Sequence, residues 1–429
     1  MLTGAAQRVI NPEPGHNLTG YGDVYPNEGV HDDLTVTALY LHDSRSFAFL
    51  LNYDLHGLNA DFNARVRKAI SEKTGVPADH VILACTHTHS GPEAADYYVR
   101  LFKKETYRPE YNEKLLQWSA DAAVDAKANA EECTLFYNSA QAAENMNRRY
   151  SFPDRRFQYI PQNKQLRGLS DEYLDRELGI IAFRKKGTLN RYKAVITVYG
   201  AHPLCVGNSS LLATADYQGA LRRTVEETFA GCCCLAMTGA AGDQHPLLPE
   251  SGFAMARNMG TRLGELAIAR CYDAIEPNYD TQLRLEYRGI TLPAKDAYSN
   301  NLLPEARERG NLPILNPKNV KSHAVDIALL GIGPILLVGM PGEIVAEIAA
   351  MIRWSSPFLK TYIMMQSTDN MGYIATPNHF LWGGYEPSMS LFAQRAGEKL
   401  VQEVVTSAYG LIEKQPLNYP VRGPEIIGW

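Results

Sequence analysis

The sequence predicts a layered α/β fold built around a mixed β-sheet. Short apolar runs rich in β-branched and aromatic residues alternate with longer amphipathic segments along most of the chain. Of the 429 residues, 45% are hydrophobic, which is enough to form a substantial core. No internal repeat or low-complexity linker divides the chain, so we expect a single domain over residues 1–413.

Strands are expected where short apolar runs are bounded by turn residues. In chain order they cover residues 34–41, 47–54, 81–86, 135–140, 179–184, 193–199, 232–237, 283–291, 325–340 and 362–366. The run 325–340 is predicted to be a hairpin, because glycine and proline occur between 331 and 334. Helices are expected where apolar residues recur with a helical period, at 60–74, 111–130, 218–230, 251–272, 343–353 and 388–413. The segment 414–429 contains three prolines, so it is predicted to be an extended tail, over the surface or against a neighbouring subunit of a homo-oligomer.

The composition excludes several kinds of partner. The net charge is −5 and the charges of both signs are interspersed, which argues against nucleic-acid binding and stable membrane association. We expect neither a signal peptide nor a membrane-spanning helix, because no apolar run is long enough. The seven cysteines include no C-x-x-C pair, so they are expected to be reduced thiols and not zinc ligands. The sequence therefore predicts a cytoplasmic protein with a small-molecule partner.

Two histidines follow the predicted strand 81–86 in the stretch VILACTHTHSGPEAAD. In a strand, side chains two positions apart point to the same side, so His87 and His89 are predicted to enter one space before the turn at 90–92. A buried pair with no ligand would need partners for four ring nitrogens. A metal-binding or catalytic role is therefore favoured over a hydrogen-bonded pair in the core.

Other polar residues also follow predicted strands. His202 comes just after the strand 193–199, and ligand sites in α/β proteins gather at the carboxyl ends of strands, so His202 is expected to meet His87. Alone, His202 would be read as a turn residue. Glu343 follows an apolar strand through Pro341 and Gly342, and an acid in the first turn of a helix would serve the helix dipole equally well.

Two further stretches are less specific. The loop in CCCLAMTGAAGDQHPLLP carries Asp243 and His245, and its small residues allow N–H groups around Gly242 to approach a ligand. A tight turn would have the same composition. Tyr373 and Tyr385 lie twelve residues apart in a glycine-rich loop, which by itself predicts an ordinary connection.

Five motifs occur in an order that resembles the neutral/alkaline non-lysosomal ceramidase family. They are THTHSGP, a later HP followed by D-x-x-G, the G-x-x-GD-x-x-P loop, PGE, and GYIAT with YE twelve residues on. The resemblance covers residues 19 to 385 and is to the catalytic domain alone, without the family's C-terminal immunoglobulin-like domain. It implies a ceramidase-like catalytic fold of four layers, α/β/β/α, and hydrolysis of a C–N bond.

The resemblance also implies a site with one zinc ion. Its ligands would be the first histidine of THTHSGP, the histidine of HP, the glutamate of PGE and the tyrosine of GYIAT, which are His87, His202, Glu343 and Tyr373. Imidazole, carboxylate and phenolate groups are acceptable zinc ligands, and a position left open for water makes such a site catalytic. His89 would then be a catalytic neighbour of the metal.

The remaining catalytic candidates surround this site. By resemblance, Arg148 in ENMNRR would bind a substrate oxygen and Tyr385 would line the pocket. Arg148, Tyr385 or the N–H groups of the loop that holds Asp243 could stabilise an oxyanion. His89 or His245 could protonate the departing amine.

This chain departs from the family in having His245 where the family has a serine, so no hydroxyl nucleophile is available there. We expect the substrate to be a smaller, more soluble amide or ester than ceramide. Two alternatives remain open. His89 and His245 could form a dinuclear centre that acts on phosphate esters, or the chain could be a non-catalytic relative that binds a small ligand.

Overall fold

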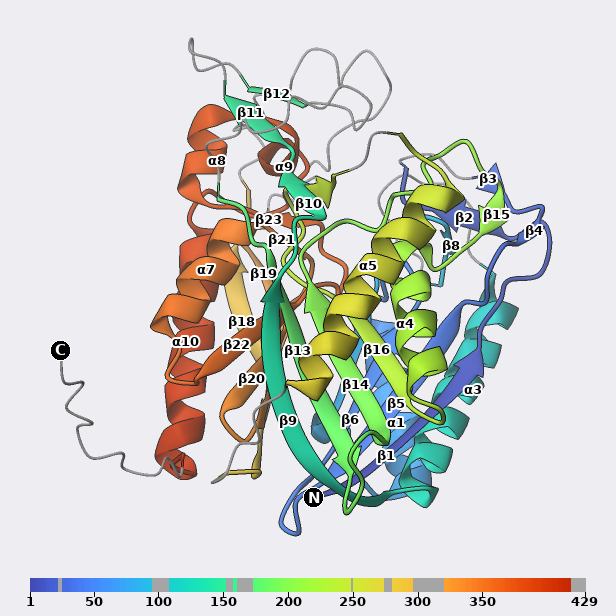
Figure 1. Ribbon diagram of the computed structural model, residues 1–429. Coiled ribbons are helices and arrows are strands. Elements are labelled where there is room, and N and C mark those ends of the chain that lie inside the picture. Colours follow the sequence, from blue (N-terminus) through green and yellow to red (C-terminus); the bar gives the residue numbers. More distant parts are fainter. Residues whose placement is uncertain are drawn as a thin grey trace, which may run out of the picture.

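The computed structural model describes residues 1–21, 25–94, 108–151, 157–159, 173–247, 250–273, 280–295 and 320–417. Two large sheets dominate this part of the chain (Figure 1). The first is eight-stranded, in the order β16-β14-β13-β9-β1-β5-β6-β7, and the second is four-stranded, in the order β18-β19-β20-β22. Both sheets mix parallel and antiparallel neighbours, as the sequence predicts.

The elements have the following bounds. The eight-stranded sheet contains β1 (Leu2–Val9), β5 (Thr35–His42), β6 (Phe47–Tyr53), β7 (Val81–Cys85), β9 (Glu131–Gln141), β13 (Glu177–Lys185), β14 (Tyr192–Tyr199) and β16 (Cys233–Thr238). The four-stranded sheet contains β18 (Leu283–Pro293), β19 (Ser322–Ile332), β20 (Ile335–Gly339) and β22 (Lys360–Met364). The short strands are β2 (Asn17–Thr19), β3 (Tyr25–Pro26), β4 (Gly29–Val30), β8 (Gly91–Pro92), β10 (Asn145–Asn147), β11 (Arg149–Ser151), β12 (Phe157–Tyr159), β15 (Leu212–Ala213), β17 (Gln244–Pro246), β21 (Glu343–Ile344) and β23 (Tyr373–Ile374). The helices are α1 (Ala60–Thr74), α3 (Pro109–Ala128), α4 (Asp216–Thr228), α5 (Phe253–Tyr272), α7 (Ala346–Ser355), α8 (Pro377–Trp382), α9 (Tyr385–Ser388) and α10 (Ala396–Lys414), with a single 3-10 turn at Ala78–His80.

Side chains that alternate along the strands create the layers. In β5, Val36, Ala38 and Tyr40 pack in the cluster that includes α1 and α3. Their neighbours Leu39 and Leu41 point the other way, into a cluster shared with the four-stranded sheet. Helices α4 and α5 cover the same outer side of the large sheet, while α7 and α10 cover the outer side of the small one (Figure 1). The result is the predicted α/β/β/α arrangement.

One central strand is not predicted from the sequence. β1 pairs with β5 along its whole length and with β9 at one end, so it lies in the middle of the large sheet. Its sequence, LTGAAQRV, lacks a strong apolar pattern because α3 passes unusually close. A Cβ atom on Gly4 would lie 1.8 Å from the carbonyl oxygen of Ala126. Small residues at this position are therefore required by the helix and conceal the strand.

Two predicted helices are shorter than expected. The helix predicted at 343–353 begins only at Ala346, and Glu343 lies in the short strand β21 instead of the first helical turn. The long helix predicted from residue 388 begins at Ala396, because backbone bridges to Gly372 and Ala294 keep Ser390 and Phe392 outside it. Of the predicted tail, residues 418–429 lie outside the described residues. Among the described helices, none combines the length and the apolar character that crossing a bilayer requires.

The carboxyl ends of three parallel strand pairs meet at one edge of the molecule. These pairs are β6 with β7, β14 with β16, and β20 with β22. Just beyond the strands, the backbone N–H of Cys85 donates to the carbonyl of Gln366 at 3.1 Å, and that of Met365 donates to Thr238 at 3.2 Å. These bonds join the ends of the two sheets and place the following loops against each other.

Candidate metal and catalytic site

His87 lies in the loop after β7 and adopts a left-handed backbone conformation, with φ of 66°. The prediction that His87 and His89 enter one space is confirmed, since their ring centroids are 4.9 Å apart, but strand alternation is not the cause, because β7 ends at Cys85. A positive φ is uncommon for a residue with a Cβ atom, and it occurs where the surroundings fix the backbone. Here the turn buries the imidazole completely and places its Nδ1 atom 2.6 Å from the carbonyl oxygen of His56.

His202 has the same arrangement from another strand. It follows β14, is fully buried, and has its Nδ1 atom 3.2 Å from the carbonyl oxygen of Gln244. A carbonyl oxygen only accepts hydrogen bonds, so in both His87 and His202 the proton is on Nδ1. Their Nε2 lone pairs then point inward, with 5.1 Å between the two ring centroids.

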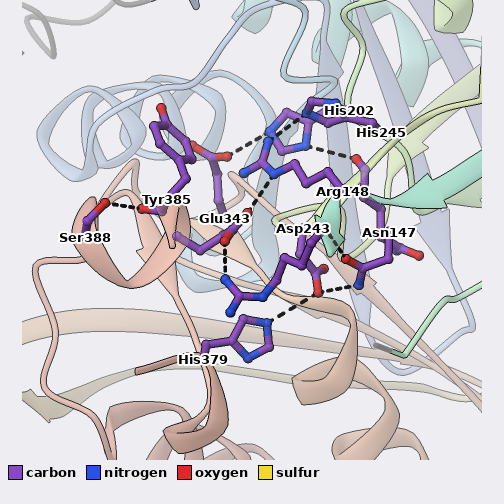
Figure 2. Close-up of polar contacts among 12 residues, drawn as sticks. Asn147, Arg148, His202, Asp243, His245, Glu343, His379, Tyr385 and Ser388 are labelled. Carbon is purple, nitrogen blue, oxygen red and sulfur yellow. Dashed lines mark hydrogen bonds and ion pairs between the residues drawn. The ribbon is translucent and has the colours of Figure 1, made fainter. Parts of the chain in front are cut away.

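Glu343 brings a carboxylate close to both rings, and Figure 2 shows it beside His202. Its Oε2 atom lies 2.9 Å from Nε2 of His202 and 3.4 Å from Nε2 of His87. Burial raises the pKa of the Glu343 carboxyl, but protonated imidazoles that donate from Nε2 would hold it well below its usual range. With the ring protons on Nδ1, as the two carbonyls require, all three facing atoms are acceptors, and they can share this space only if a cation lies among them.

These residues fit a divalent metal ion. The donor atoms of His87, His202 and Glu343 all lie within 4.8 Å of one another, and each residue is buried. Both histidines also bond a backbone carbonyl through the nitrogen that faces away, which is the arrangement that orients histidine ligands in metalloproteins. The donor set of imidazole and carboxylate is one that zinc accepts.

Tyr373 lies beside Glu343 because the short strands β21 and β23 pair these two residues directly. The ring is buried. Burial and the neighbouring Glu343 carboxylate raise the pKa of Tyr373 well above its ordinary value, so the phenol keeps its proton unless a cation lies beside it. Tyr373 is thus adjacent to the converging donors, as a fourth ligand would have to be.

His89 contacts His87, with 3.4 Å between the two Nε2 atoms, and its ring centroid lies 5.5 Å from that of His202. Its Nδ1 atom is buried and has no hydrogen-bond partner among the described residues. Tyr21 packs edge-on against the ring, and Gly20 lies directly against it. The side chain is thus held in place by packing, with Nδ1 available for another contact.

Replacing Gly20 with alanine is expected to displace His89. Gly20 has φ of +125°, and a Cβ atom there would lie 2.5 Å from Cγ of His89. Forcing a methyl group into such a space costs about 1–3 kcal/mol, and His89 would have to move. The measurements are urea denaturation and turnover. Gly252→Ala is the matched control, because Gly252 also has a positive φ but nothing lies within 4 Å of the added methyl group. Equal losses in both variants would mean that backbone strain alone is responsible.

Arg148 is held between an acid and a histidine (Figure 2). Its Nε donates to Oε1 of Glu386 at 2.7 Å, and its Nη1 donates to Nε2 of His245 at 2.8 Å. The guanidinium also lies 5.4 Å from the ring centroid of Tyr373 and 5.3 Å from that of Tyr385. A fixed positive charge therefore lies beside the predicted ligand Tyr373.

The bond from Arg148 determines what His245 can do. An arginine only donates, so Nε2 of His245 is an acceptor and the ring proton is on Nδ1. Burial and the Arg148 charge lower the pKa of His245 well below its ordinary value. Of the loop N–H groups around Gly242 that were predicted as oxyanion donors, that of Gly242 itself already donates to the carbonyl of Ile344 at 2.9 Å, while the role of the others stays a prediction.

The carboxylate of Asp243 points toward the start of α7 and toward His379 in α8. Oδ1 accepts from the N–H of Ala346, the first residue of α7, at 2.8 Å. Oδ2 accepts from Asn147 at 2.9 Å and lies 3.5 Å from Nε2 of His379, while the Asp243 carbonyl accepts from the N–H of Arg148 (Figure 2). Asp243 therefore ties the segment that carries Arg148 to the start of α7, which is a positioning role.

Tyr385 marks the open side of the site. It is 40% exposed, whereas the other predicted site residues are buried. Its ring lies 5.4 Å from that of Tyr373, edge to face, so the two tyrosines lead from solvent toward the buried donors. This placement agrees with a residue that lines the entrance of a pocket.

Three residues of the site were missed in the sequence. His56 follows β6 and packs against His87 with the rings tilted, Glu386 binds both Arg148 and Arg149, and His379 contacts Asp243. His56 carries the signal that identified His202, since it comes shortly after the carboxyl end of a strand. Glu386 is the acid of the YE motif. Nothing in the local sequence around His379 distinguishes it from an ordinary helical residue.

The comparisons with known proteins agree with this architecture. Residues 4–239 match the family model described as neutral/alkaline non-lysosomal ceramidase, N-terminal. The crystal structure of neutral ceramidase from Pseudomonas aeruginosa aligns with 99% of this chain and 76% of its own, with a TM-score of 0.78 and 18% identity. A structure described as ceramidase complexed with C2 aligns with 99% of this chain and 77% of its own, also with a TM-score of 0.78, at 17% identity. No curated protein matches in sequence. At these identities, the structural likeness establishes the fold.

Proposed function

The chain belongs to the neutral/alkaline non-lysosomal ceramidase family, and from this premise we propose that it is a zinc-dependent hydrolase that cleaves a C–N amide bond in a small substrate. Membership implies a hydrolase of amide bonds. The observation that carries the metal assignment is the convergence of Nε2 of His87, Nε2 of His202 and Oε2 of Glu343. Tyr373 is the proposed fourth ligand. A bound zinc ion would supply Lewis acidity, polarising a carbonyl and acidifying a water molecule.

The protein's own groups provide the remaining chemistry. Arg148 is positioned to stabilise negative charge that develops on the carbonyl oxygen, because Glu386 and His245 fix its guanidinium. Tyr385 lines the entrance and can donate its hydroxyl proton to the same oxygen. His89 is the proposed proton carrier, taking a proton from the attacking water and returning one to the departing amine. His245 is unsuited to that task at Nε2, which accepts from Arg148.

The substrate is proposed to be a small, soluble amide or ester. Tyr385 is exposed while the charged groups beside it are buried, which suits a substrate with a compact polar head. With His245 in place of the family serine, hydrolysis would proceed by direct attack of water, without an acyl-enzyme intermediate. A cytoplasmic location remains part of this proposal.

The proposal is tested by measuring metal content and amide hydrolysis together. The purified full chain should contain about one tightly bound zinc ion and release amines from some members of a panel of N-acyl compounds. Negligible zinc after incubation with zinc salts would refute it. If a compound raises the melting temperature of the protein but is not hydrolysed, the chain is better explained as a non-catalytic relative that binds a small ligand. Turnover of a generic phosphodiester, without amide hydrolysis, would favour the phosphoesterase alternative.

A further inference from the structure

We propose that this protein holds a second divalent cation beside the first, on His56 and His89. This inference rests on the proposed function, since it takes His87, His202 and Glu343 as ligands of the first cation. The site it adds lies next to His87. It would take a cation that accepts imidazole nitrogen, such as Zn²⁺, Co²⁺ or Mn²⁺.

The three imidazoles on that side form a compact buried group. Ligand nitrogens of His56, His87 and His89 lie within 4.8 Å of one another. The ring centroid of His56 is 4.2 Å from that of His87 and 5.1 Å from that of His89. This closeness follows from the sheet, because β6 and β7 are parallel neighbours and each is followed by one of these loops. The backbone contributes as well, since the His56 carbonyl fixes the His87 ring.

His87 cannot serve both cations. Its Nδ1 is bonded to the His56 carbonyl, so a single lone pair remains, on Nε2. That atom lies 3.4 Å from Oε2 of Glu343 and 3.4 Å from Nε2 of His89. The first cation site includes the Glu343 carboxylate and is therefore expected to bind its cation more tightly. His87 is assigned to that site. The second position then depends on His56 and His89 and should be the weaker of the two.

His89 has a nitrogen to offer. Its Nδ1 atom is buried and has no hydrogen-bond partner in the described part of the chain, and its side chain is only 8% exposed. Buried polar atoms normally have partners, and exceptions require an explanation such as an ion. His245, which the sequence also suggested for a dinuclear centre, is not part of this group. It lies on the far side of His202 and accepts from Arg148.

Two cations in this arrangement would be close enough to interact. Paired metal ions in hydrolases lie about 3.5–4 Å apart, a spacing at which two Mn²⁺ ions are magnetically coupled. Ligand nitrogens of His87 and His89 lie within 4.8 Å of each other, which is compatible with ligands of adjacent ions. The second cation would occupy the lone pair of His89, so in the form with two cations this ion, in place of His89, would help to activate the water. It would also add a contact for a substrate oxygen and would favour substrates with two oxygen atoms near the reacting bond.

The test is a metal titration of the full chain after removal of bound metal. Bound Co²⁺ or Mn²⁺ is counted by emission spectroscopy after gel filtration at rising free-metal concentrations, and the Mn²⁺ form is examined by EPR. We expect two equivalents in the wild type, the second bound at least about 10-fold more weakly, and a coupled Mn²⁺ signal at saturation. His56→Gln should bind one equivalent and show an uncoupled signal. His80→Gln is the control, because His80 lies just before β7, at the opposite end of the strand from the site. This variant should still bind two metal equivalents.

Saturation of the wild type at one equivalent, without a coupled signal, would overturn the proposal. So would a folded His56→Gln variant that keeps two equivalents. If this variant does not fold, the stoichiometry and EPR signal of the wild type decide the question alone. One equivalent together with amide hydrolysis would reject the second cation and leave the proposed function intact, whereas no bound metal would reject both.

Discussion

His202→Ala is expected to lose its tightly bound metal and nearly all amide hydrolysis. The imidazole is fully buried, and its Nε2 atom lies 2.9 Å from Oε2 of Glu343, so its removal takes away a proposed ligand and leaves a cavity. Loss of a supporting hydrogen bond around a metal site costs roughly 10–100-fold in affinity, and loss of a ligand should cost more than that. Metal content by emission spectroscopy and competition with a chelator measure the change. His87→Ala should behave in the same way.

Two variants provide the comparison. His80→Ala, at the opposite end of β7, should retain metal and activity. His89→Ala should retain the first, tightly bound metal while turnover falls, because His89 is proposed to carry a proton and not to bind that ion. A His87→Ala or His202→Ala variant with full metal content would show that the ligand assignment is wrong.

Glu386→Gln is expected to destabilise the fold by about 3–5 kcal/mol, the usual cost of breaking a buried ion pair. Oε1 accepts from Arg148 at 2.7 Å and Oε2 accepts from Arg149 at 2.6 Å, and all three side chains are at least 97% buried. Removing the carboxylate takes an ion-pair partner away from two buried arginines. Urea denaturation measures the effect. Glu398→Gln is the control: the Glu398 pair with Arg395 is exposed, and it should cost less than about 1 kcal/mol.

The same carboxylate predicts how stability depends on pH. Burial opposes ionisation of Glu386, but the two arginines outweigh it and lower its pKa to about 2. A carboxyl with a lowered pKa in the folded state adds stability above its unfolded pKa and loses that contribution as the pH falls toward the folded pKa. We therefore expect the wild type to lose stability between about pH 4.5 and pH 2, and Glu386→Gln to lose less over that range. Identical acid profiles would show that Glu386 is not the group responsible.

Much of the fold can be predicted because its signals are local. Helix α1 has the predicted bounds, and the hairpin of β19 and β20 turns where glycine and proline occur. The exceptions are equally physical. β1 lacks an apolar pattern because α3 requires Gly4, and Glu343 lies in a strand because pairing with Tyr373 competes with the start of the helix. Such choices depend on contacts between segments far apart in the chain.

For the candidate site, the sequence by itself determined which chemical groups are present and that several of them follow strands whose carboxyl ends meet at one edge. It could not determine which atom of each side chain faces inward. That was decided by hydrogen bonds to distant partners: the His56 carbonyl turns His87, Arg148 turns His245, and Ala346 with Asn147 turns Asp243. The physical reason is that strand periodicity is encoded by neighbouring residues, whereas the direction of a buried donor or acceptor is set by whichever partner the tertiary structure brings to it.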